Sequence, residues 1–149
     1  NLGGGRSITF SVNGSYLKSS QRLSASQPDV DLAGTIFNPP HYRGRAGVVW
    51  DDASLVLASY LSYIGGVTDN RAATSFHIGS MTTLDFTAVV HVGSSGGLAE
   101  GVDVSLSLLN ALNDKPSIIS NSLSYVTPYD STNYTPVGRF VSLTISKRF

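Results

Sequence analysis

Residues 137–149 decide the fold, and they read Val137-Gly138-Arg139-Phe140-Val141-Ser142-Leu143-Thr144-Ile145-Ser146-Lys147-Arg148-Phe149. In an extended strand, apolar side chains alternate onto one face: Val141, Leu143, Ile145 and Phe149. The other face carries mostly hydroxyl and basic groups. Soluble domains tend to end in loose residues, whereas the closing strand of an outer-membrane β-barrel needs an apolar lipid-facing side and an aromatic residue at the interface. The stretch therefore favours a transmembrane strand.

The composition agrees with a membrane barrel. Hydrophobic residues make up 41% of the 149 residues, so disorder is not expected. Charged residues make up only 13%, against about 25% in typical soluble proteins. The net charge is zero, which gives no reason to expect a nucleic-acid partner. No apolar run approaches the ~20 residues of a membrane-spanning helix, but a barrel strand needs only ~9–11 alternating residues. The chain starts at Asn1 without a signal-peptide pattern, so we expect a removed leader or a longer parent.

Alternation predicts an all-β protein with six antiparallel strands and no helix. The strands are expected at residues 6–23, 42–50, 54–64, 79–92, 101–109 and 137–149. The third is blurred, and we assign its odd-numbered side chains to the lipid face. Tight turns are expected at residues 51–53 and 93–97, and long loops separate the other strands. Barrels pair short periplasmic turns with longer external loops, and this chain alternates in that way if its C-terminus is periplasmic.

Aromatic side chains are expected to form two girdles at the bilayer interfaces. Phe10, Trp50 and Phe149 would lie near the inner rim, and Tyr16, Tyr42 and Tyr63 near the outer rim.

Four stretches carry a family resemblance, and in chain order they are Pro40-x-Tyr42-Arg43-x-Arg45-x-Gly47-Val48-Val49-Trp50, Tyr63-Ile64-Gly65-Gly66-x-x-Asp69, Asn110-Ala111-Leu112-Asn113-Asp114-Lys115-Pro116, and Tyr129-Asp130 with the closing strand from Gly138. Across about three quarters of its length, the chain resembles the C-terminal end of a TonB-dependent outer-membrane receptor. Two departures stand out. Lys147 occupies a position that is often aromatic in the family, where its long stem can reach the interface. The family's N-terminal plug and TonB-contacting segment are not in this chain.

The resemblance implies a plugged barrel of about 22 strands in the bacterial outer membrane. Residues 1–149 would form its C-terminal segment and take part in TonB-dependent import of a scarce nutrient such as a siderophore. Six strands in lipid would leave two unpaired edges, each missing partner costing several kcal/mol, so other strands must complete the sheet. The implied partners are the lipid bilayer, the remaining strands and plug, TonB through the plug, and the barrel-assembly machinery.

The candidate site residues lie on the predicted lumen face. Arg43 and Arg45 could hold an anionic ligand, although packing against plug carboxylates or a neighbouring acid is the simpler reading. Asp85 and Asp103 also face inward, where hydrogen bonding to a plug or to water is the simpler reading. The histidines lack the spacing of a metal pair, and no nucleophile has a supporting base, so we expect no metal, no cofactor and no enzymatic activity.

The closing strand could also serve as the signal that the assembly machinery reads by strand addition. By resemblance, that signal would comprise Gly138, Val141, Leu143, Ile145 and Phe149.

Two other architectures remain open. A self-contained eight-stranded barrel would need two more strands from residues 28–40 or 117–134, which alternate poorly. A soluble β-sandwich binding module would bury the apolar faces against each other. The sequence does not identify the transported ligand.

Overall fold

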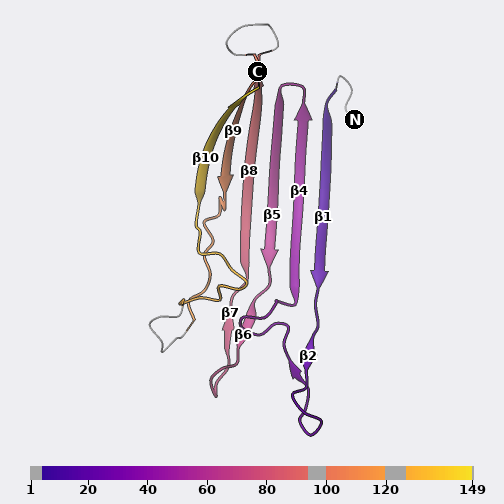
Figure 1. The fold of residues 1–149 in the computed structure, drawn as a ribbon, viewed down its shortest axis with the longest axis vertical. Helices are drawn as coiled ribbons and strands as arrows, with labels where there is room; N and C mark the ends of the chain where they lie inside the picture. Colours follow the sequence, from indigo (N-terminus) through magenta and orange to yellow (C-terminus); the bar gives the residue numbers. More distant parts are fainter. Residues whose placement is uncertain (1–4, 94–99, 120–126, 149) are drawn as a thin grey trace.

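The computed structural model describes residues 5–93, 100–119 and 127–148. These residues contain strands, turns and loops and no helix, so none of them forms a helix able to cross a membrane. The six long strands are β1 (Ser7–Tyr16), β4 (Tyr42–Asp52), β5 (Leu55–Ile64), β8 (Met81–Val92), β9 (Val102–Leu109) and β10 (Phe140–Lys147). They form one sheet in the order β1-β4-β5-β8-β9-β10 (Figure 1).

Every neighbouring pair in this sheet is antiparallel, and each strand pairs with the next long strand along the chain. The prediction of an all-β, antiparallel architecture is confirmed. The sheet is open: β1 and β10 are its edges and do not pair with each other. Strand lengths run from 8 to 12 residues, close to the ~9–11 of a membrane-crossing strand.

Several strand boundaries differ from expectation; β10, for example, begins at Phe140 and not at residue 137. The first strand ends at Tyr16 and does not continue to residue 23. Its partner β4 begins at Tyr42, just after Pro39 and Pro40, which lack the N–H needed to extend the ladder. The first tight turn lies at residues 53–54, because Asp52 still pairs with Leu55. Most of the second expected turn, residues 93–97, lies outside the described residues.

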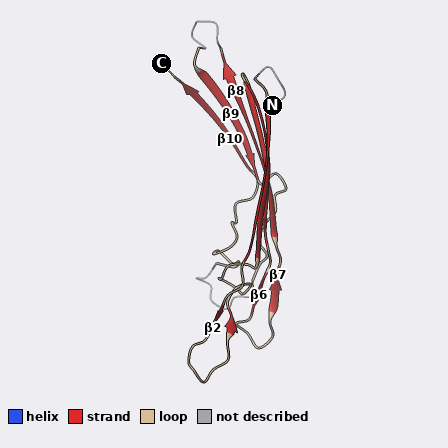
Figure 2. Cartoon of the chain, turned by 90° about the vertical axis from the view of Figure 1, so that its right-hand side faces the viewer, coloured by secondary structure: helices blue, strands red, loops and turns tan. Residues whose placement is uncertain are grey.

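Two short hairpins in the loops were not predicted. One joins β2 (Ser20–Gln21) to β3 (Val30–Asp31), and the other joins β6 (Val67–Asp69) to β7 (Phe76–Ile78). The described parts of the three long connections, with these hairpins, gather at one end of the sheet, opposite the end where β1 begins and β10 ends (Figure 2). We call their described residues, 17–41, 65–80, 110–119 and 127–139, the loop unit.

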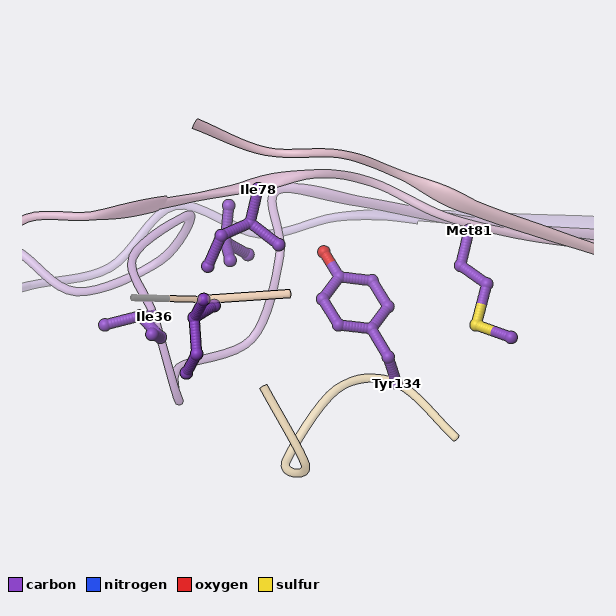
Figure 3. Packing of buried hydrophobic residues seen from close by; sticks show 6 residues of the cluster. Ile36, Ile78, Met81 and Tyr134 are labelled. Atoms are coloured by element: carbon purple, nitrogen blue, oxygen red, sulfur yellow. The ribbon is translucent and has the colours of Figure 1, made fainter. Parts of the chain in front are cut away.

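The buried hydrophobic cluster lies where the loop unit meets the ends of β5 and β8, and not between two sheets. Tyr134 lies between Ile78 and Met81, with Ile36 nearby (Figure 3). The cluster comprises Ile36, Val67, Ile78, Met81, Ile119 and Tyr134, with Phe37 and Ile64 packed against it. The first loop joins the second through a short parallel pairing, in which Ile36 N donates to Thr68 O at 2.9 Å. The loops are therefore one packed body.

Candidate functional site

The strand register sorts the side chains of the sheet into two faces. Residues paired directly across antiparallel strands project to the same side of a sheet. Trp50 pairs with Leu57, Leu57 with Ala88, Ala88 with Leu106, and Leu106 with Leu143. Most of the large apolar side chains of the six strands therefore share one face, which we call the apolar face, although Val49, Val56 and Val89 project to the opposite face. The blurred third strand obeys the same rule, so Leu55, Leu57, Leu61 and Tyr63 lie on this face.

No described element covers the apolar face. Phe10 and Val12 are 77% and 84% exposed, and the closing-strand residues Val141, Leu143 and Ile145 are 61%, 64% and 67% exposed. A shallow hollow of about 480 Å³ lies on this face, where the side chains of Ser59 and Ala88 are smaller than their neighbours. The larger side chains around it are those of Val48, Trp50, Leu57, Phe86, Leu106 and Leu108. An uncovered apolar face of this extent marks an interaction surface.

The described aromatic residues among those expected in the girdles lie on the apolar face. Tyr16 pairs with Tyr42 at the loop end of the sheet, with ring centroids 5.0 Å apart. Tyr63 pairs with Gly44, which lies two residues after Tyr42 on β4. Trp50 pairs with Ile8 near the opposite end, whereas Phe10 pairs with Val48 further into the sheet. Phe149 lies outside the described residues. Whether these rings meet membrane interfaces stays a prediction.

The opposite face, the polar face, carries a hollow beside the loop unit. It has a volume of about 410 Å³ and lies over β1, β4 and β5. The alternating side chains that line it are Asn13, Ser15, Arg43, Arg45, Ser62 and Ile64. This is the candidate functional site, because it concentrates basic and hydroxyl groups where the loops meet the sheet.

The two candidate arginines flank this hollow on one strand. Nη2 of Arg43 donates to Oδ1 of Asn133 in the third loop at 2.9 Å. The guanidinium carbon of Arg45 lies 4.3 Å from the centroid of the Tyr60 ring, a cation–π contact. The ring itself lies over Gly47, where an added Cβ would come within 2.5 Å of it. Neither arginine forms an ion pair with any described carboxylate.

The two candidate aspartates lie elsewhere and have local partners. Oδ1 of Asp85 accepts a hydrogen bond from the Asn110 backbone N–H at 2.8 Å, where the chain leaves β9. Asp103 lies near the opposite end of the sheet, where its carboxylate accepts from His91 Nδ1 at 2.7 Å and from Arg148 Nη2 at 3.0 Å. The structure thus brings Arg43 and Arg45 together but leaves Asp103 apart from them.

Asp130 organises the loop unit and was not singled out as a site residue. Its side chain is fully buried and accepts hydrogen bonds from the backbone N–H groups of Phe37 at 3.1 Å, Thr132 at 3.1 Å and Asn133 at 3.3 Å, and from Asn133 Nδ2 at 2.8 Å. A buried carboxylate is stable only when it is this well satisfied. The Asp-Ser-Thr-Asn run at 130–133 is a turn signal that could have drawn notice.

Asn133 connects this centre to the sheet. Its Nδ2 also donates to the carbonyl of Asn38 at 2.7 Å, while its Oδ1 receives the bond from Arg43. One amide therefore ties the first loop, the third loop and the polar face together.

Tyr134 provides a second link between loops. Its hydroxyl donates to the carbonyl of Gly65 at 2.7 Å, and the residue is 4% exposed. Burial first, and then the negative charge of Asp130, raise the pKa of Tyr134 to about 12. The hydroxyl is therefore protonated at neutral pH and remains a donor.

Arg71 and Asp69 hold the second loop in shape. Two guanidinium nitrogens of Arg71 donate to the Asp69 carboxylate at 2.9 and 2.7 Å, and its backbone N–H donates at 3.1 Å. These bonds lower the pKa of Asp69 below its ordinary value, with the side-chain bond as the largest cause. The Arg71 guanidinium also lies 5.3 Å from the Phe37 ring centroid.

The third resembling stretch closes the end of β9. Asn110 and Asn113 adopt left-handed backbone conformations, with φ of 47° and 55°, which asparagine tolerates better than most residues. Oδ2 of Asp114 accepts from the Thr82 N–H at 2.7 Å, and Oδ1 of Asn113 accepts from the Arg139 N–H at 3.0 Å. These bonds fix where β10 enters the sheet.

The proposed assembly-signal residues are only partly described. Val141, Leu143 and Ile145 lie on the apolar face of β10, an edge strand. Gly138 precedes β10, and an added Cβ there would come within 2.7 Å of Asn113 Oδ1. Phe149 lies outside the described residues.

Within the described ranges, no three acidic or histidine side chains come together in a way that could hold a metal ion. Comparisons with models of protein families, with curated proteins and with solved structures found no match to this chain.

Proposed function

We propose that this chain is the C-terminal barrel portion of a TonB-dependent outer-membrane receptor and takes part in the import of a scarce nutrient. The observation that carries the proposal is the strand register, which collects most of the large apolar side chains of six strands on one uncovered face. A lipid bilayer is the environment in which such a face is stable.

The two faces differ as the two sides of a barrel wall differ. The outer side of a membrane barrel is apolar, and its interior is polar. Here, Ser11, Asn13 and Ser15 of β1 alternate with Phe10, Val12 and Tyr16, and comparable alternation recurs on β9 and β10. The loop unit packs beside the polar face, through Arg43 and through Met81, at the end where external loops are expected.

The open edges call for further strands. β1 and the part of β10 from Phe140 to Ser146 each pair with one strand among the described residues, so their outward-facing N–H and C=O groups face no further strand. In hydrocarbon, each such group costs several kcal/mol. Additional strands, from the same polypeptide or another one, would satisfy these groups and close the wall.

Each rival architecture has a feature against it. The eight-stranded barrel needs two more long strands, but residues 28–40 contribute only the two-residue β3, and the described parts of residues 117–134 contain no strand. The β-sandwich needs a second sheet over Val141, Leu143 and Ile145, and all three are exposed.

The membrane environment can be tested with Trp50, the only tryptophan of the chain, which lies on the apolar face. In bilayers whose acyl chains carry bromine, we expect strong quenching of Trp50 fluorescence and weak quenching by aqueous iodide. The matched variant Val49→Trp with Trp50→Phe moves the indole to the polar face. Its fluorescence should be quenched weakly by brominated lipid and strongly by iodide.

Two outcomes would contradict the proposal. One is equal quenching of both proteins by brominated lipid. The other is recovery of the native protein in the soluble fraction without detergent. Participation in import predicts that uptake by cells carrying the receptor stops when TonB is deleted and returns when it is restored.

A further inference from the structure

The hollow on the polar face holds two positive charges that the described residues leave uncompensated. Arg43 and Arg45 are both exposed and flank Gly44 on β4. No described carboxylate lies within ion-pair distance of either guanidinium. Asp85, on the same face, directs Oδ1 to a backbone N–H, and Asp130 is already occupied by four N–H donors.

Both guanidiniums are held in place but keep free donors. Arginine has five N–H groups, and Arg43 uses one of them on Asn133. Arg45 is held by its stacking on Tyr60 and makes no hydrogen bond to a described residue. Stacking and a single amide contact orient the planar groups without neutralising them, which is the preorganisation that an anion site needs.

The spacing indicates the kind of anion. The Cα atoms of residues two apart on one strand are roughly 6.5–7 Å apart. Arg43 contacts Asn133 whereas Arg45 stacks on Tyr60, so the two guanidiniums suit two anionic groups better than a single carboxylate. Asn13 and Ser62 pair with Arg45, and Ser15 and Ile64 pair with Arg43, so no acidic side chain lies beside either cation on the neighbouring strands. A volume of about 410 Å³ suffices for a small organic molecule.

We propose that this hollow binds a small polycarboxylate, with one carboxylate on Arg43 and a second on Arg45. The site rests on the proposed function only in that the polar face is taken to line an enclosed interior. Because Arg43 also contacts Asn133, binding of the anion would change the contact between the sheet and the third loop.

The test is calorimetric titration of the detergent-solubilised protein, at constant ionic strength, with propane-1,2,3-tricarboxylate, acetate and inorganic phosphate. We expect tricarboxylate to bind at least about tenfold more tightly than acetate, because two charge-assisted contacts replace one. Arg43→Gln and Arg45→Gln should each weaken tricarboxylate binding about tenfold or more. The control Arg22→Gln removes the same charge from an exposed arginine paired with Asp29 in the first loop, and should leave binding unchanged.

Several results would overturn the site. These are no tricarboxylate binding by the unaltered protein, equal weakening by Arg22→Gln, or phosphate binding as tightly as tricarboxylate. If Arg43→Gln and Arg45→Gln destabilise the protein although the unaltered protein binds no tricarboxylate, then carboxylates of the protein itself contact these arginines. A protein that inserts in the outer membrane but ignores tricarboxylate contradicts this site alone. A soluble protein that binds it contradicts the membrane proposal alone.

Discussion

The hydroxyl of Tyr134 donates a hydrogen bond to the carbonyl of Gly65, 2.7 Å away and separated by 69 residues of sequence. This bond joins the third loop to the point where β5 ends and the second loop begins. Replacing Tyr134 with Phe keeps the ring in the hydrophobic cluster but leaves a buried carbonyl without its partner. We expect the loop unit to lose about 1 kcal/mol of stability, measured by amide hydrogen exchange at residues 65–69.

The same residue gives a prediction about pH. The pKa of Tyr134 in the folded protein is about 12, above the ordinary 10, so folding favours the protonated form. Its stabilising effect is complete below pH 10 and is lost as the pH rises through 12. The difference in absorbance at 295 nm between the unaltered protein and Tyr134→Phe should titrate near pH 12. A midpoint near pH 10 would contradict the buried hydrogen bond.

Replacing Asp130 with Ala should loosen the loop unit more strongly. The change leaves the backbone N–H groups of Phe37, Thr132 and Asn133 without their acceptor. Phe37 also has a positive φ of 62°, which its bond to Asp130 helps to stabilise. A loss of about 1–3 kcal/mol is expected for each group left buried and unsatisfied, reduced where water enters. Limited proteolysis within residues 127–139 measures the effect.

The control for Asp130→Ala is Asp29→Ala, which removes an exposed carboxylate paired with Arg22. Surface pairs of this kind contribute about 0–1 kcal/mol, so proteolysis should change little. Equal sensitivity of the two variants would mean that Asp130 has no organising role.

The long strands could be predicted from sequence because each carries its own period-two pattern. In the blurred strand 55–64, the register places the odd-numbered side chains on the apolar face by pairing Leu57 with both Trp50 and Ala88, and their contact with lipid stays a prediction. The loop unit could not be predicted, because its stability depends on contacts between distant segments. Asp130 and Phe37, 93 residues apart, give no local signal of their bond. Likewise, only the sheet register shows that Tyr60 lies over Gly47 and beside Arg45.

That packing of Tyr60 gives a matched pair of glycine variants. A Cβ at Gly47 would lie 2.5 Å from Tyr60 ring carbons and 2.8 Å from Ser11 Oγ, whereas one at Gly44 would meet only Asn13 O at 3.7 Å. Gly47→Ala should therefore cost about 1–3 kcal/mol through overpacking, measured by chemical unfolding in bilayers. Gly44→Ala should be neutral within about 0.5 kcal/mol.

A double-variant cycle checks the cause. If the ring is the obstacle, Gly47→Ala should cost much less in the background of Tyr60→Ala. An unchanged cost would assign the effect to Ser11 Oγ or to the backbone and not to the ring.

Adjacent positions on β10 test the identity of the two faces most directly. Leu143 pairs with Leu106 on the apolar face, and its neighbour Ser142 pairs with Ser107 on the polar face. Leu143→Arg would place a charge in hydrocarbon, which costs about 2–4 kcal/mol near the middle of a bilayer. Ser142→Arg would place the same charge in a wet interior and should cost far less. The two variants are compared by folding each into lipid vesicles, where heat-modifiable migration on a gel measures the folded fraction and chemical unfolding measures stability. If Ser142→Arg proves the more damaging change, the apolar face does not meet lipid and the proposed function fails with it.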